Sequence, residues 1–393
     1  MTTKAQLFVT AAKLAGNVAR ERVVPGKVTT LEEIPPSADA LSREWLTAAL
    51  CGDVPGAAVD AFEVVGGSDG TSSRRALRVT YNERGRAAGL PTRLFTKSAS
   101  SFQSRLMLVA GGVTESETIF YRDIRPLLDG LRSPRSFYAA FDPKTYRSLV
   151  IMDDLSADGW AFPDPMQDTV NRQDAEDMVD QMAYYHAAFW DDPRLSREFG
   201  KLADTEVFLQ RINDVGLLNA AKRGLDRIEA VTPPAIFRRR DELIPTTMRA
   251  LHLNATGIPT LLHQDVHQGN WLRDPQGRMG LYDWQAVARG EWALDYAYAM
   301  SVNLTTENRR AWEHDLLERY LWRLGEEGVP NPLSFEQAWL RYRQQPFHVV
   351  IFSLLTIGAG RFQPAMQPAD YMARCWERIA VFLDDHESLD SLG

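Results

Sequence analysis

The chain contains the octapeptide HQDVHQGN, from His263 to Asn270, and thirteen residues later the tripeptide DWQ, which begins at Asp283. An aspartate, an asparagine five residues further on and a second aspartate after a short hairpin are the polar groups that a kinase places around a transferred phosphate. Asp265 is expected to take the proton of an acceptor hydroxyl, and oxygen atoms of Asn270 and Asp283 are expected to ligate Mg²⁺. The spacing therefore predicts a phosphotransfer centre.

The same octapeptide allows a second interpretation, because His263, Asp265 and His267 form the pattern H-x-D-x-H of some transition-metal hydrolase sites. The chain has only seven histidines and no second dense cluster of His and Asp to complete such a site. The kinase interpretation is preferred because it also accounts for Asn270 and Asp283. It leaves His263 as a brace of the loop.

Composition narrows the class of protein. With 393 residues the chain exceeds the usual size of a single hydrophobic core, so two lobes are expected. Its net charge of −8 argues against nucleic acid as a partner. Cys51 and Cys375 are too few for a disulfide scaffold and are expected to be buried thiols of a cytoplasmic protein. The apolar run Val349–Ile357 is about half the length of a membrane span, so no span is predicted, and the oligomeric state stays open.

A Gly-rich segment between two strand patterns, Val59–Val65 and Ala76–Tyr81, is expected to form a turn from residue 66 to residue 73. Glycine permits close approach of the backbone to phosphate groups, so Gly67, Gly70 and Ser72 are candidate ATP-binding residues. Only part of the G-x-G-x-x-G pattern is present, and the turn taken alone favours a plain hairpin with a loose loop.

Two further residues extend the prediction of an ATP site. Lys97 ends a short apolar strand that starts at Leu94; solvated lysines are commoner than buried ones, but its place after the Gly-rich turn favours a phosphate contact. Glu117, in the next helix, is expected either to pair with Lys97 or to form a capping box with Thr114. The residues alone leave both possibilities open.

Two more strands, Arg135–Phe141 and Arg147–Met152, precede the expected lobe boundary. The apolar side chain of Met152 and the backbone near Asp154 are candidates for contact with adenine. Most of the remaining chain has helical periodicity, and His186 is expected to be a hydrogen-bonded core residue. The predicted division is a leader at 1–40, an ATP-binding lobe at 41–153 and a lobe with the catalytic loop, metal motif and acceptor site at 154–393.

On these motifs the chain resembles the aminoglycoside phosphotransferase and choline-kinase-like superfamily, in particular its ecdysteroid-kinase-like branch. The resemblance covers about residues 40–385 and rests on the spacing His263-x-Asp265-x-x-x-x-Asn270, on the DWQ tripeptide, on Glu117 and on Lys97. It implies an α+β, bilobal protein-kinase-like fold, with an antiparallel sheet plus helix in the small lobe and a larger, mainly helical lobe. It also implies ATP- and Mg²⁺-dependent phosphorylation of a small-molecule hydroxyl.

The chain departs from this family in two places. Gln264 stands where the family usually has glycine, and the Gly-rich loop is incomplete. Asp295 resembles the aspartate that follows the metal motif in the family, for which a bracing role is expected.

The leading hypothesis for function is a kinase whose acceptor is a small hydroxyl compound, with a neutral, hydrophobic alcohol as the favoured class. The acidic composition would also suit an aminoglycoside or another antibiotic as acceptor. A catalytically silent nucleotide-binding module is the alternative from another class, motivated by the incomplete Gly-rich loop.

Overall fold

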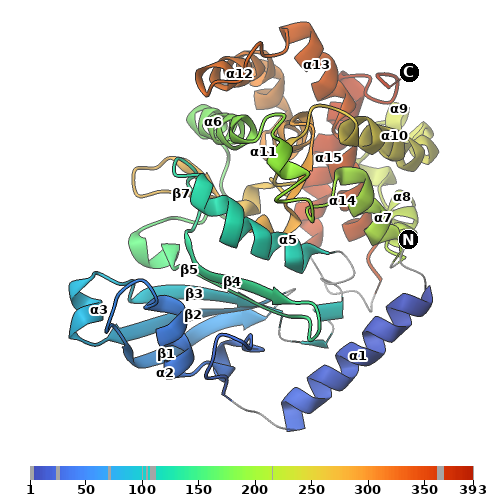
Figure 1. Ribbon diagram of the computed structural model, residues 1–393. Helices are drawn as coiled ribbons and strands as arrows, with labels where there is room; N and C mark the ends of the chain where they lie inside the picture. The colour runs from blue at the N-terminus through green and yellow to red at the C-terminus, as the bar shows by residue number, and fades with distance from the viewer. Residues whose placement is uncertain are drawn as a thin grey trace. The chain divides into compact units, whose positions relative to one another are not determined.

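The computed structural model describes residues 4–23, 27–69, 72–99, 101–102, 105–106, 112–214, 216–360 and 367–392. The chain divides into two compact units (Figure 1). The first unit contains residues 1–129 and 134–159, and the second contains residues 130–133 and 160–393.

A five-stranded antiparallel sheet forms the centre of the first unit, in the strand order β1-β2-β3-β5-β4. The predicted α+β class and antiparallel sheet are therefore confirmed. The strands are β1 (Val59–Asp69), β2 (Ser73–Tyr81), β3 (Arg93–Ser98), β4 (Ser136–Asp142) and β5 (Arg147–Asp153). The helices of this unit are α1 (Lys4–Val23), α2 (Arg43–Leu50), α3 (Glu83–Ala87) and α5 (Val113–Ile119).

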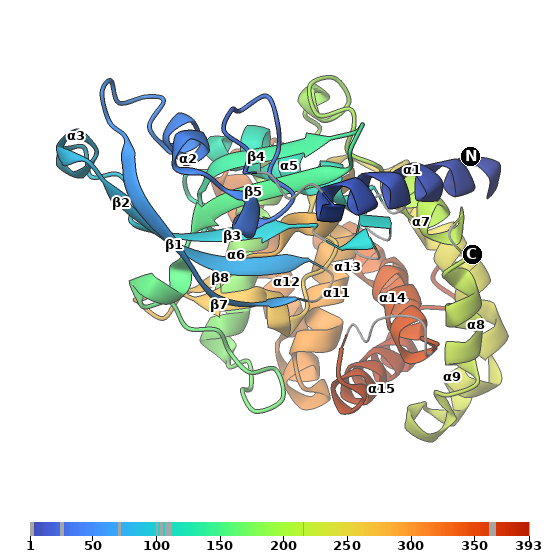
Figure 2. The same ribbon diagram turned by 90° about the horizontal axis from the view of Figure 1, so that it is seen from below.

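The two faces of this sheet have different partners, because side chains alternate along a strand. One face contributes Leu94 and Ile151 to a core with Trp45 of α2. The opposite face carries Lys97, which lies across from Val150 in the β3–β5 register. Figures 1 and 2 show α2 and α5 on opposite sides of the sheet. The sequence alternation thus separates the hydrophobic core from the face that bears the lysine.

The predicted turn from residue 66 to residue 73 is wrong in its extent. Strand β1 continues to Asp69 and β2 begins at Ser73, with an irregular register between Val65 and Ser68. Gly67 has a φ of +128°, and a Cβ atom there would lie 2.0 Å from the carbonyl oxygen of Arg74. Glycine is therefore required at residue 67 because the strand forms a bulge there, inside the hairpin. The composition of the segment alone could not distinguish this bulge from a turn.

The segment from Thr114 to Glu117 is expected to open a helix that Pro126 kinks or ends early, and the regular helix does end early. Regular α5 ends at Ile119, and a π-helical turn and a 3₁₀ turn follow it, at 120–124 and 125–127. Pro126 lies in the 3₁₀ turn, where its missing N–H cannot continue an α-helix. The N-cap of α5 is Gly112, with no side-chain cap. Since Thr114 lies inside the helix, the capping-box interpretation of Glu117 is wrong.

The second unit is mainly helical. Its helix α11 is buried along its whole length, and α6 packs against α12. None of the described helices is both long and apolar enough to cross a membrane. The helices are α6 (Arg172–Ala188), α7 (Thr205–Asp214), α8 (Leu218–Leu225), α9 (Pro234–Arg238), α10 (Leu243–Ala255), α11 (Ala293–Asn303), α12 (Thr306–Glu326), α13 (Phe335–Gln344), α14 (Phe347–Ile357) and α15 (Ala369–Asp385).

Two short antiparallel ladders in this unit hold the predicted phosphotransfer motifs. Strand β6 (Thr260–Leu262) pairs with β9 (Ala288–Gly290), and β7 (Trp271–Arg273) pairs with β8 (Met279–Leu281). The loop from 263 to 270 connects β6 to β7, and the loop from 282 to 287 connects β8 to β9. In sequence, the β7–β8 ladder lies between β6 and β9. Each of the two loops therefore leads from one ladder to the other.

Candidate active site

The loop that follows β6 is held by a buried carboxylate of α11. Asp295 accepts hydrogen bonds from the backbone N–H of His263 at 2.7 Å and of Gln264 at 2.8 Å, and its Oδ2 also accepts from the hydroxyl of Tyr185 at 2.8 Å. Burial raises the pKa of Asp295, but the donors around it, including His186, lower the pKa on balance. These contacts are those of the brace that was predicted for Asp295.

His263 is occupied on both ring nitrogens. Its Nδ1 accepts from the backbone N–H of Asp265 at 3.2 Å, and its Nε2 lies 3.0 Å from the carbonyl oxygen of Tyr282. Since a carbonyl can only accept, Nε2 carries the proton and the ring is neutral; burial, the main influence, also lowers its pKa. His263 therefore braces the loop and has no nitrogen lone pair left for a metal. In the part of the chain described here, no group of three His, Cys, Asp or Glu side chains could hold a metal ion.

Asp265 presents its carboxylate between two donors. Oδ1 accepts from the hydroxyl of Tyr298 at 3.0 Å, and Oδ2 accepts from the amide nitrogen of Asn270 at 3.1 Å. Burial and the charge of Asp265 raise the pKa of Tyr298, so its hydroxyl stays protonated and donates. The Nε2 atom of His267 lies 3.8 Å from Oδ1, and its Nδ1 caps the short 3₁₀ helix at 268–270. The carboxylate is thus fixed in direction by groups from two elements.

Asn270 and Asp283 are brought together by the nested ladders. The backbone N–H of Tyr282, the residue before Asp283, donates to the carbonyl oxygen of Asn270 at 3.0 Å. Asp283 itself has a left-handed backbone, with φ of 64° and ψ of 58°, an uncommon conformation that marks many functional positions. Because the amide nitrogen of Asn270 donates to Asp265, its amide oxygen is the atom suited to a cation.

The backbone conformation of Gln264 explains why glycine is the usual residue at this position in the family. Its φ is 64°, in the left-handed region that glycine adopts without steric cost. The residue is fully buried, and neither polar atom of its side chain has a hydrogen-bond partner among the described residues. Its carbonyl oxygen accepts from Nε2 of His348 at 2.9 Å. The substitution therefore keeps the turn of the loop and adds a buried amide beside Asp265.

Lys97 and Glu117 pair within the first unit. The Nζ atom of Lys97 lies 2.6 Å from Oε1 of Glu117, and the two side chains are 6% and 11% exposed. A buried ammonium needs such a partner to remain charged. This contact decides between the two sequence interpretations of Glu117.

The other candidate ATP residues lie in the same unit. Ser72 is buried, and its hydroxyl has no hydrogen-bond partner in the described part of the chain. Met152 lies on β5 opposite Phe95 of β3. Asp154 directly follows β5, and its Oδ1 accepts from the hydroxyl of Ser156 at 2.5 Å. Gly70 lies outside the described residues.

Sequence reasoning missed Tyr298, which contacts the central carboxylate directly. Tyr298 lies three residues after Asp295 on α11, and residues at this spacing share a helix face. The helical pattern and the family aspartate could together have identified it. His348 gave no such signal, because it reaches the loop from α14, more than eighty residues away in sequence.

Other sequence predictions about single residues are confirmed. His186 is fully buried and its Nδ1 lies 2.8 Å from the hydroxyl of Tyr320, so it is a hydrogen-bonded core histidine. Cys51 and Cys375 are both free and buried.

A search of solved structures finds chains that are similar to this one. Similar solved structures include choline kinase LicA from Streptococcus pneumoniae, with 15% identity and a TM-score of 0.45, covering 86% of this chain and 98% of that one. Macrolide 2'-phosphotransferase MphH from Brachybacterium faecium has 15% identity and a TM-score of 0.43, with the same coverage of 86% and 98%. An ethanolamine kinase from Plasmodium vivax has 11% identity and a TM-score of 0.44, with coverage of 82% of each chain.

A comparison with curated proteins gives no match. The profile of the ecdysteroid kinase-like family, by contrast, matches residues 77–328, well over half of the chain. This range includes Lys97, Glu117 and the two loops between the nested ladders. The chain therefore belongs to the ecdysteroid kinase-like family.

Proposed function

We propose that the protein is a small-molecule kinase that transfers the γ-phosphate of ATP to a hydroxyl group in a Mg²⁺-dependent reaction. The observation that carries this proposal is the carboxylate of Asp265, which Tyr298 and Asn270 hold, next to the backbone hydrogen bond from Tyr282 to Asn270 that precedes Asp283. Phosphoryl transfer depends on positioning and charge neutralisation more than on covalent chemistry. A fixed carboxylate next to oxygen ligands meets that need.

Asp265 accepts the hydrogen bond of the acceptor hydroxyl and takes its proton as the hydroxyl oxygen attacks phosphorus. Tyr298 and Asn270 hold the two carboxylate oxygens, so the carboxylate does not have to reorient during transfer. In the first unit, Lys97 contacts the phosphates of ATP, and Glu117 keeps its ammonium charged and in place.

The residues present fit Mg²⁺. Asn270 and Asp283 offer an amide oxygen and a carboxylate, the hard oxygen ligands that this ion prefers, and a set of only two suits Mg²⁺ because it keeps water and phosphate oxygens as its other ligands. Bound there, Mg²⁺ would neutralise charge on the transferred phosphate. Gly67, Ser72, Met152 and Asp154 complete the proposed nucleotide-binding set, together with Gly70.

Membership of the ecdysteroid kinase-like family supports a neutral, hydrophobic alcohol as the acceptor. An aminoglycoside or a macrolide is the alternative acceptor. A screen with radiolabelled ATP against sterols, choline, sugars, aminoglycosides and macrolides separates these classes. Label transferred only to a cationic antibiotic would overturn the neutral alcohol while leaving the kinase intact.

The test of the reaction is Asp265→Asn. Loss of the proton acceptor should lower kcat by about 10²- to 10⁴-fold while binding of MgATP survives. Asp315→Asn is the matched control, because it removes one carboxylate that is 67% exposed and whose ion pair within the described ranges is with Arg172 at 3.4 Å. Unchanged kcat in Asp265→Asn would refute the role of Asp265. Binding of MgATP by the wild type without turnover of any acceptor would instead indicate the silent nucleotide-binding module.

A further inference from the structure

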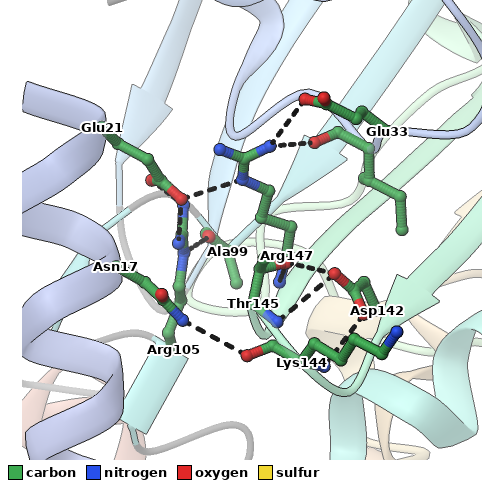
Figure 3. Close-up of polar contacts among 10 residues, drawn as sticks. Asn17, Glu21, Glu33, Ala99, Arg105, Asp142, Lys144, Thr145 and Arg147 are labelled. Atoms are coloured by element: carbon green, nitrogen blue, oxygen red, sulfur yellow. Dashed lines mark hydrogen bonds and ion pairs between the residues drawn. The ribbon is translucent and has the colours of Figure 1, made fainter. Parts of the chain in front are cut away.

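A glutamate of the N-terminal helix α1 lies at the centre of an ion network in the first unit (Figure 3). Glu21 accepts two hydrogen bonds from Arg105, at 2.9 and 2.7 Å, and a third from Nε of Arg147 at 2.8 Å. The side chain of Glu21 is 13% exposed and that of Arg105 is fully buried. Burial raises the pKa of Glu21, but the two arginines lower it on balance, so the carboxylate is charged at neutral pH.

Arg105 connects this carboxylate to the end of strand β3. Its Nε donates to the carbonyl oxygen of Ala99 at 2.7 Å, and Ala99 lies only two residues after Lys97. Glu21 and Ala99 thus satisfy all three nitrogens of a fully buried guanidinium. A bidentate contact of this kind fixes direction as well as distance. The position of the backbone just beyond Lys97 therefore depends on Arg105, and the position of Arg105 depends on Glu21.

Arg147 connects the same carboxylate to the neighbouring strand. It is the first residue of β5, and its Nη1 donates to the carbonyl oxygen of Ile34 at 3.0 Å. Strand β5 pairs with β3 so that Val150 lies opposite Lys97. Glu21 therefore contacts β5 directly through Arg147 and is linked through Arg105 to Ala99, the residue after β3.

We infer that Glu21 is a positioning residue for the Lys97–Glu117 pair and that α1 is part of the nucleotide-binding machinery. The inference rests on the proposed role of Lys97 in binding ATP. Removing the carboxylate leaves a buried guanidinium with no acid, which a protein avoids by moving the arginine toward water. Arg105 would then release Ala99, and the ammonium of Lys97 would lose its defined distance from the phosphates.

The test compares Glu21→Gln with Glu33→Gln. Glu33 is the matched control, because its carboxylate also approaches Arg147, at 3.8 Å, but is 70% exposed and, among the described residues, forms no ion pair with Arg105. Glu21→Gln should raise KM for MgATP on the order of tenfold and leave KM for the acceptor unchanged, since small misplacements of a binding group have effects of at least this size. Glu33→Gln should leave both constants unchanged. Glu21→Asp, which keeps the charge, should recover part of the affinity for MgATP.

Hydrogen–deuterium exchange without nucleotide separates this inference from the proposed function. In Glu21→Gln, peptides that cover β3 and β5 should exchange faster than in the wild type, whether or not the protein phosphorylates anything. Faster exchange confined to α1, with normal KM for MgATP, would show that α1 only covers the sheet and would overturn the inference. Faster exchange in β3 and β5 combined with no binding of MgATP by the wild type would reject the proposed function, and with it the role for α1, while confirming the coupling of Glu21 to the sheet.

Discussion

At the scale of single residues, the central carboxylate depends on a neighbour that lies on another element. Asp265 belongs to the loop after β6, whereas Tyr298 belongs to α11, and the hydroxyl of Tyr298 donates to Oδ1 of Asp265 at 3.0 Å. A hydrogen bond to a charged group contributes about 1.5–3 kcal/mol. The direction of this carboxylate should therefore respond to a change in Tyr298 alone.

Tyr298→Phe removes that donor and keeps the ring. We expect kcat to fall by about tenfold to a hundredfold, from the free energy of one charge-assisted hydrogen bond, with little change in KM for MgATP. Tyr296→Phe is the control, because Tyr296 is a buried tyrosine of the same helix whose hydroxyl has no partner among the described residues. Steady-state kinetics of both variants give the kcat and the KM for MgATP that test this expectation. Equal kcat values for the two variants would show that the contact with Asp265 has no catalytic consequence.

At the scale of elements, the loop from 263 to 270 and helix α11 act as one structure. Asp295 binds two successive backbone N–H groups of the loop through its two carboxylate oxygens. A loop without regular secondary structure has its backbone donors satisfied in this way by a side chain. The conformation of the catalytic loop should therefore depend on the charge and acceptor capacity of Asp295.

Asp295→Asn replaces one acceptor oxygen by a donor and leaves a buried N–H of the loop without a partner. The free energy of unfolding should fall by about 1–3 kcal/mol, and kcat should fall with it because Asp265 is the next residue of the loop. Ser301→Ala is the control on the same helix, since the hydroxyl of Ser301 donates to the carbonyl oxygen of Tyr298 within α11 and not to the loop. Urea unfolding gives the stability of each variant. A stable Asp295→Asn with full activity would contradict the bracing role.

The π-helical turn after α5 and the bulge at Gly67 are also features at the scale of elements. In both places the sequence pattern predicts the correct type of element, a helix or a hairpin, but not its irregular backbone geometry. Local periodicity indicates a helix from Thr114 onward, but the effect of Pro126 on the preceding turn depends on how the backbone is packed. Glycine at 66 and 67 is compatible with a turn or with a strand bulge, and pairing with β2 decided for the bulge.

At the scale of the whole molecule, buried histidines make stability depend on pH. His348 is 1% exposed, and burial lowers its pKa to about 4. In the unfolded chain a histidine has a pKa of about 6.5, so the unfolded state binds a proton that the folded state does not. This contribution to stability is complete above pH 6.5 and is lost progressively as the pH falls toward 4. Burial lowers the pKa of His186 and of His263 as well, with the same sign of effect.

His348→Gln should make stability less sensitive to acid. Glutamine can still donate to the carbonyl oxygen of Gln264 but does not titrate. Between pH 7 and pH 5 the wild type should lose about 2 kcal/mol through His348, and the variant should lack this part of the loss. Urea unfolding followed by tryptophan fluorescence at both pH values measures the difference. Parallel losses in the two proteins would show that His348 is not the titrating group.

The sequence by itself determined the antiparallel sheet, the mainly helical remainder and the order of Lys97, Glu117, Asp265, Asn270 and Asp283. Those features depend on alternation, helical periodicity and short spacings, which are local properties of a chain. The nested ladders then bring Asn270 and Asp283 together because strand pairing is also local here, within thirteen residues.

Only the tertiary structure decided that Glu117 pairs with Lys97, that Tyr298 and His348 support the loop around Asp265, and that Glu21 binds Arg105 and Arg147. The partners in these last two groups lie between 33 and 126 residues apart in sequence. The packing of whole elements decides which partner a buried charged side chain has. Any acid or donor that the fold brings near can compensate for burying that charge, so the partner is not fixed by the local sequence. No local pattern carries that information.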